Sequence, residues 1–223
     1  MLLSKSKGFN LVELMVAMVA GLLLVAAASA LFASILKANK TAMQVSRLNQ
    51  ELQSITDMMA RDIQRAGYDA SAAAHTLVSG ALPFYFDSTQ HLLNKYSSSP
   101  DKFRCIAVKY DERDANAPSP GLPGAKEAVV YSYRSTSTDS SIWLDDLSAS
   151  ASLATLSAAC GTGGERISTD DTIKITDLTF TLLPSSVSSG ARTIRLTITG
   201  NDIKSPALAL TLQRDIKLRN DGF

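Results

Sequence analysis

Histidine and cysteine are scarce in this chain, which has two of each among 223 residues. His75 and His91 are isolated, and because neither belongs to an HExxH pattern or stands beside a nucleophile, we expect both at the surface. The serines form no GxSxG elbow, and neither Cys105 nor Cys160 has a second zinc ligand at the usual spacing. Strong charge of one sign is also absent, since the formal net charge of +1 gives no global basic field for nucleic acid. The sequence therefore indicates no enzyme, no cofactor and no nucleic-acid partner.

What the chain does contain is one long apolar run near its N-terminus. The run follows a short basic leader with Lys5 and Lys7, and it has no charge between Leu14 and Ile35. It is long enough for one helix to cross a bilayer, with the leader left on the cytoplasmic side. An ordinary signal peptide has an apolar core of about 7–15 residues that ends in a small-residue cleavage site. Here the core is longer, and the best cleavage site, Gly8–Phe9, precedes it.

Glu13 is the exception within this apolar segment. A carboxylate inside a membrane segment costs roughly 2.5–3.5 kcal/mol on insertion scales, so it normally has a partner. A buried carboxylate is tolerated when a cation within about 4–6 Å holds it ionised. Glu13 therefore indicates a specific contact with a positive group. A lone membrane anchor with an incidental glutamate is the alternative.

The sequence KGFNLVE, from Lys7 to Glu13, resembles the class III leader of type IV pilins and related pseudopilins. The resemblance implies that a prepilin peptidase cleaves between Gly8 and Phe9 and that the new amine of Phe9 is N-methylated. It also implies that Glu13 pairs with the Phe9 amine of a neighbouring subunit in a filament. Ala30 departs from many major pilins, which have a helix-breaking proline there. Without that proline, the sequence leaves open whether this helix partly melts when the subunit assembles.

The apolar pattern continues beyond the membrane segment as an amphipathic helix. Apolar residues recur every three or four positions, with polar and charged residues on the other faces. This stripe consists of Met43, Val45, Leu48, Leu52, Ile55, Met59 and Ala66, with Met58 and Ile63 beside it. Arg65 in the last turn and Gly67 after it form a stop signal. We therefore expect one helix over residues 9–66 whose second half packs on a sheet, with a free coiled coil as the alternative.

The rest of the chain alternates turn chemistry with strand patterns. Residues 68–102 are predicted to be loop-rich, 148–159 a loop or weak helix, 161–165 (GTGGE) a flexible turn without the ending of a phosphate loop, and 184–192 a hairpin loop. Strands are predicted at 103–110, 127–135, briefly at 142–144, and then at 173–183, 192–200 and 208–220. The predicted fold is α+β, type IV pilin-like, with the long N-terminal helix packed on an antiparallel β-sheet.

Four segments follow from these patterns and from the resemblance. They are a prepilin leader peptide at 1–8, a transmembrane and filament-core helix at 9–36, its amphipathic continuation at 37–67, and a periplasmic or extracellular β-rich domain at 68–223. Cys105 and Cys160 both follow the membrane helix, and an oxidising periplasm would favour a disulfide between them, with two unpaired buried thiols as the alternative.

Charged clusters offer two weaker candidates. Asp111, Glu112 and Asp114, or Asp170 with Asp171, could hold calcium, but neither group matches EF-hand spacing and solvated loop charge explains both. Arg192, Arg195, Lys204 and Arg214 could form a weak patch facing DNA, although exposed strand residues explain them equally well. We expect no metal site and no nucleic-acid site from these residues.

A second resemblance narrows the family. The segment MARDIQRAGYDA, Met59 to Ala70, and the closing IKLRN, Ile216 to Asn220, are similar to PilW-like minor pilins. The resemblance implies an inner-membrane protein that enters the pilus and primes its assembly. The implied partners are other minor pilins, the major pilin, the prepilin peptidase, the inner-membrane assembly platform and inner-membrane lipid. The alternatives are a J-type pseudopilin of type II secretion and a tip adhesin or DNA-uptake module on a pilin anchor.

Overall fold

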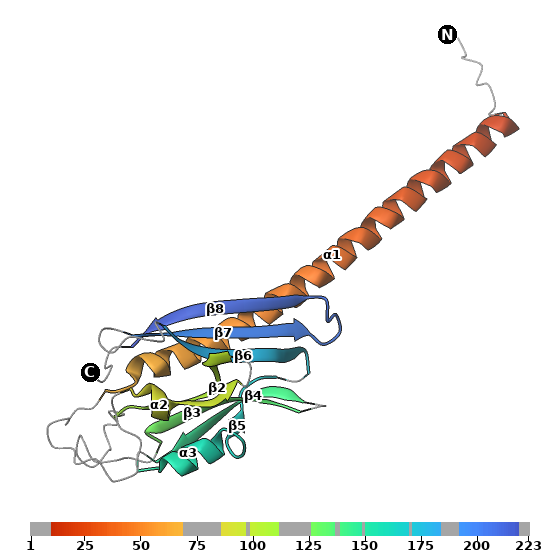
Figure 1. Cartoon of the computed structure of the whole chain (residues 1–223). Helices are drawn as coiled ribbons and strands as arrows, with labels where there is room; N and C mark the ends of the chain where they lie inside the picture. The colour runs from red at the N-terminus through yellow and green to blue at the C-terminus, as the bar shows by residue number, and fades with distance from the viewer. Residues whose placement is uncertain are drawn as a thin grey trace. The chain divides into compact units, whose positions relative to one another are not determined.

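A computed structural model of the chain is shown in Figure 1. It describes residues 10–68, 86–96, 99–111, 126–136, 139–148, 150–169, 171–183 and 192–218. The chain forms two compact units, Met1–Ser46 and Arg47–Phe223, which we call unit 1 and unit 2 and describe separately. The predicted α+β fold is confirmed, since a long N-terminal apolar helix is followed by an antiparallel sheet.

Helix α1 spans Leu11–Arg65, close to the predicted bounds. Glu13 lies in its first turn and Arg65 in its last, where the helix dipole favours a negative and a positive charge respectively. The helix ends where the sequence indicates, because Gly67 has a positive φ of 82° and donates its N–H to the carbonyl of Lys109. That hydrogen bond joins the end of α1 to the sheet.

The part of α1 within unit 2 buries one stripe of side chains. Leu48, Leu52, Ile55, Met59 and Ile63, spaced three or four residues apart, share one core cluster with side chains of the sheet. Two residues predicted to begin this stripe, Met43 and Val45, are instead exposed by 73% and 42%. The correction has a simple cause, because unit 2 begins only at Arg47 and the sheet covers α1 from the next residue onward.

Among the described residues the sheet has eight strands, and all of the pairings between them are antiparallel. The strands are β1 Leu92–Tyr96, β2 Ser99–Lys109, β3 Ala128–Ser135, β4 Ser140–Leu147, β5 Glu165–Arg166, β6 Ile173–Leu183, β7 Thr193–Asp202 and β8 Ala209–Lys217. Their order is β5-β4-β3-β2-β6-β7-β8, with β1 paired to β2 outside this path. The short helices α2 and α3 span Ser88–His91 and Leu153–Ala159.

Two halves of the sheet meet at β2. Strands β3, β4 and β5 form one half, and β6, β7 and β8 form the other. β2 joins the second half through β6, and in the described part of the chain their main-chain pairing is limited to Lys102 with Thr181 and Phe103 with Phe180. Side chains add two links, since the Tyr133 hydroxyl donates to the carbonyl of Thr176 at 2.7 Å and Tyr96 hydrogen-bonds to Asp177. Thr176 and Asp177, the β6 residues in these two contacts, lie at an irregularity of that strand.

The C-terminal strands show the predicted alternation. In β7, buried Ile194, Leu196 and Ile198 belong to the core cluster that contains α1, and the residues between them are only half-buried. Gly200 continues the inward series, and a Cβ there would lie 3.2 Å from a methyl group of Leu52. A glycine at this position therefore lets α1 lie close to the strand.

Other local predictions need correction. Within residues 68–102, predicted to be loop-rich, the described positions hold α2, β1 and the start of β2, whereas residues 69–85 and 97–98 lie outside the described residues. Asp87 caps α2 by accepting from the Thr89 N–H, and pairing with β2 sets the register of β1. These elements are too short to give a periodic signal.

Three further segments can be compared with their predictions. β4 extends well beyond the predicted 142–144, and α3 is the helix anticipated as weak at 148–159, capped by Ser152. Within GTGGE, Gly163 and Gly164 have positive φ as a turn requires, but Glu165 already begins β5. The hairpin loop expected at 184–192 falls almost wholly outside the described residues.

The buried stripe leads to a stability prediction. Replacing Leu52, whose side chain is fully buried, by Ala should lower the free energy of unfolding by about 2–5 kcal/mol, because it leaves a cavity between α1 and β7. Met43→Ala is the matched control on the same helix and should change it by less than about 0.5 kcal/mol. Urea unfolding in detergent, followed through Trp143, the single tryptophan, measures both. Equal effects of the two substitutions would contradict the assignment of the stripe.

Candidate assembly site

Unit 1 presents an apolar surface along α1. Every described side chain from Asn10 to Met43 is exposed within this chain, including large ones such as Leu24 at 72% and Phe32 at 63%. The helix is long and apolar enough to cross a membrane. Because so large an apolar surface is not stable in water, it requires lipid or other apolar helices around it. It therefore anchors the chain as a single-pass segment.

Glu13 is the acidic group on this surface. It lies in the first turn of α1, just after Asn10, whose carbonyl accepts the N–H of Leu14 at 3.1 Å. Its side chain is exposed, and no residue in the described part of the chain forms a hydrogen bond or ion pair with it. Gly8 and Phe9, predicted as the cleavage and methylation positions, lie outside the described residues. Glu13 is thus available to a partner beyond these residues.

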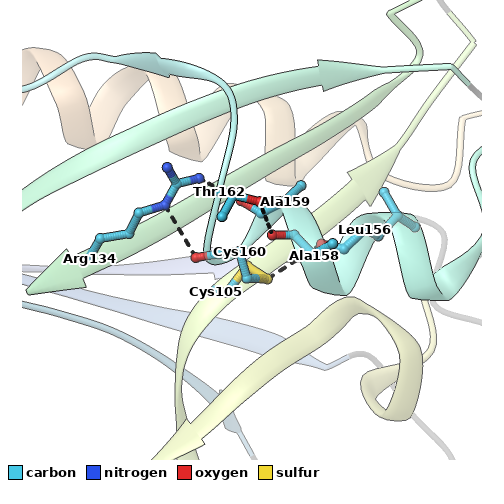
Figure 2. The surroundings of a disulfide bond; sticks show 7 residues. All are labelled: Cys105, Arg134, Leu156, Ala158, Ala159, Cys160 and Thr162. Carbon is cyan, nitrogen blue, oxygen red and sulfur yellow. Dashed lines mark hydrogen bonds between the residues drawn. A yellow bond between two sulfur atoms is a disulfide. The ribbon is translucent and has the colours of Figure 1, made fainter.

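The two cysteines form a disulfide that joins β2 to the C-terminal end of α3, with Cα atoms 5.8 Å apart (Figure 2). Cys105 and Cys160 are fully buried in a second, smaller cluster. This cluster combines Ala107, Ala128, Val130, Leu156 and Ala159 with the disulfide. Few large side chains pack between α3 and the sheet here, so apolar burial stabilises their contact only weakly. The disulfide adds the stabilisation that this small core lacks.

Arg134 of β3 holds the end of α3 from beside the disulfide. Its guanidinium donates to three carbonyl oxygens, those of Ala159 at 2.6 Å, Gly163 at 2.9 Å and Cys160 at 3.3 Å. Figure 2 shows the side chain reaching the terminal turn of the helix. It also lies over the Trp143 ring, 4.7 Å from the centroid. Burial lowers the pKa of Arg134, and the nearby charge of Asp145 acts in the opposite direction.

Asp62 joins the last turns of α1 to β3. Its carboxylate accepts from the Tyr131 hydroxyl at 2.5 Å and from the Tyr110 hydroxyl at 3.4 Å. Burial and the hydrogen bond to Asp62 raise the pKa of Tyr131, which therefore remains a donor. Burial likewise raises the pKa of Asp146, with the charge of Asp62 among the contributors. The sequence gives no sign of this cluster, because it joins residues separated by up to 69 positions.

Polar contacts also hold α1 at two points nearer its entry to unit 2. The Glu51 carboxylate accepts from the backbone N–H and the hydroxyl of Thr169. Asp57 forms an ion pair with Arg214 of β8. Together with Asp62, these acids space three attachments along the helix. They orient α1 on the sheet, while burial of the apolar stripe supplies most of the stabilisation.

The other candidate residues form no common site. His91 is buried rather than at the surface, because its ring packs on Phe86 with centroids 4.8 Å apart and its Nδ1 lies 3.0 Å from the N–H nitrogen of Asp87. His75, Glu112, Asp114 and Asp170 lie outside the described residues. Asp111 is buried and Asp171 exposed, and the described residues contain no group of three or more potential metal ligands.

The predicted basic residues are largely engaged. Arg195 pairs with both carboxylate oxygens of Asp215, at 2.8 and 2.9 Å, and Arg214 pairs with Asp57. Arg192 donates to the carbonyl of Phe86 at 3.3 Å. Two of the four predicted basic residues, Arg195 and Arg214, are thus each paired with an aspartate, so the four residues do not form a free basic patch.

The fold and this site define a pilin-like protein. An apolar helix with one carboxylate in its first turn continues into an antiparallel sheet stabilised by a disulfide. Residues 41–218 match the family described as prepilin peptidase-dependent protein B (PpdB), and the chain belongs to this family. The match begins after the apolar run, so it is independent of the leader resemblance. Comparisons with curated proteins and with solved structures give no match.

The disulfide generates a prediction for unit 2. Replacing Cys105 and Cys160 together by Ala should cost about 4 kcal/mol, because the bond closes a loop with a sequence separation of 55. Thermal unfolding by circular dichroism under non-reducing conditions measures the loss. The double variant should be insensitive to reductant, whereas reductant should destabilise the parent chain. If reductant leaves the melting temperature of the parent chain unchanged, the structural role of the disulfide is contradicted.

Proposed function

We propose that this protein is a PilW-like minor pilin that primes type IV pilus assembly with other minor pilins. The observation that carries the proposal is Glu13, an exposed carboxylate in the first turn of an apolar helix with no partner among the described residues. A carboxylate in that position needs a cation, and a neighbouring subunit can supply one as its terminal amine. The chain belongs to a family named for its dependence on prepilin peptidase, and cleavage by that enzyme would create such a terminal amine.

The proposed maturation produces that terminal amine. The prepilin peptidase cleaves between Gly8 and Phe9, and the amine of Phe9 is then N-methylated. This places the new amine four residues before Glu13, about one helical turn away. A neighbour in a filament, staggered along the helix axis, can bring its amine to the Glu13 carboxylate of this subunit. The same geometry makes the contact repeatable along a bundle of α1 helices.

The proposed location is the inner membrane, with unit 2 in the periplasm before the subunit enters the pilus. The disulfide between Cys105 and Cys160 supports this orientation, because such bonds persist in oxidising compartments. Lys5 and Lys7 before the apolar run favour a cytoplasmic N-terminus. The proposed partners are sibling minor pilins, the major pilin, the prepilin peptidase, the inner-membrane assembly platform and the surrounding lipid. No enzymatic activity and no cofactor are proposed.

A deletion strain tests this function. We expect loss of surface pili by electron microscopy with exoprotein secretion intact, because a priming subunit acts before the filament grows. Restoration by the parent gene is the control. Retained pili with lost secretion would instead assign the chain to a type II secretion system, as a J-type pseudopilin. If pili and secretion are both retained, the priming role is wrong and a tip-binding role becomes the better explanation.

Complementation of the same strain tests the role of Glu13. Glu13→Ala and Glu13→Gln should enter the membrane normally yet restore less than about a tenth of the pili, because both lack the charge that pairs with an amine. Asp101→Ala, which removes an exposed carboxylate from β2, is the matched control and should complement fully. Normal piliation with Glu13→Gln would contradict charge pairing.

A further inference from the structure

The apolar run of α1 is followed at once by two cations. Lys37 and Lys40 are exposed, and at a spacing of three residues they lie on the same face of the helix. The helix is continuous at this point, since α1 extends without a break from Leu11 to Arg65. Both lysines therefore project from a regular helix directly beyond the membrane segment.

No acidic side chain of the helix neutralises these lysines. The nearest acidic residues along the sequence are Glu13 and Glu51, and the Glu51 carboxylate already accepts hydrogen bonds from Thr169. In the part of the chain that the structure describes, no carboxylate pairs with either lysine. The segment from Leu14 to Gln50 thus carries positive charge alone, and its first two cations stand together.

Helix geometry places this pair at a defined depth. The residues from Leu14 to Leu36 span about 34 Å at 1.5 Å per residue, which slightly exceeds a hydrocarbon core of about 30 Å. Lys37 and Lys40 then fall within the next 6 Å or so, which is about the thickness of the headgroup layer on one side. The anions of that layer are phosphates, and lysine side chains are long enough to adjust to them.

We propose that Lys37 and Lys40 form a binding site for the phosphate groups of anionic phospholipids in the leaflet next to unit 2. The charges are complementary, and the site is continuous with the membrane-spanning segment. This inference rests on the membrane anchoring in the proposed function, but it adds a lipid preference and a fixed insertion depth. Each lysine near an anionic surface strengthens the association about fivefold. The contact holds the subunit in register in the membrane and must break when it enters a filament.

Lipid selectivity of the full-length protein tests the proposal. The chain is reconstituted in phosphatidylcholine bilayers with traces of spin-labelled phosphatidylglycerol or spin-labelled phosphatidylcholine. Electron paramagnetic resonance then gives the relative association of each lipid with the protein. We expect phosphatidylglycerol to be preferred several-fold and the preference to fall as salt rises. The double variant Lys37→Gln, Lys40→Gln should lose most of the preference.

A matched double variant guards against non-specific charge effects. Lys174→Gln with Lys204→Gln removes two exposed lysines of unit 2 and should keep the preference. Equal association of the two lipids with the parent chain would overturn the proposal. It would also be overturned if the Lys37, Lys40 variant kept its lipid preference but no longer entered filaments, because the lysines would then serve a neighbouring subunit. Alkaline carbonate extraction separates the cases, since extraction of the parent chain would refute the anchor itself, and retention without selectivity refutes the lipid site alone.

Discussion

Burial of the Leu48–Ile63 face of α1 against the sheet is the contact on which the rest of unit 2 depends. Among the described residues, the two halves of the sheet are joined by two main-chain pairing positions, between β2 and β6, so backbone hydrogen bonding alone joins them weakly. Side chains of α1, of β3 and of β6 to β8 belong to one core cluster, which extends across this joint. The helix therefore replaces much of the main-chain pairing that a continuous sheet would have. The polar attachments at Glu51, Asp57 and Asp62 fix its rotation and position on that surface.

The same helix meets two different environments. Its N-terminal part exposes apolar side chains on all sides and has Glu13 as its acidic group, whereas from Leu48 it buries one face and exposes charges on the others. The change occurs within a few residues, at the boundary between unit 1 and unit 2. A sheet domain folded on one end of a helix leaves the other end free for lipid or for other helices. The proposed priming function fits this division, because the core of unit 2 is built from residues of one chain.

Much of this architecture could be predicted from the sequence because its signals are periodic or local. The recurrence of apolar residues about every 3.6 positions predicts α1 and its end before Gly67, and the alternation of apolar and polar residues predicts β6, β7 and β8. The exposure of Met43, the short strand β1 and the Asp62–Tyr131 contact could not be predicted. Each depends on where distant segments meet, and periodicity carries no information about that. Arg134 is the clearest example, because nothing in its strand sequence indicates that it caps the end of a helix 25 residues away.

The proposed pairing of Glu13 requires a mature chain that begins at the amine of Phe9, four residues earlier in the sequence. Intact-mass and N-terminal sequencing of the protein purified from membranes tests that claim most directly. The account predicts a chain that starts at Phe9 with one added methyl group, and an uncleaved chain with its leader in cells that lack the prepilin peptidase. A mature N-terminus beyond the apolar run, or processing that is unchanged without the peptidase, would contradict it.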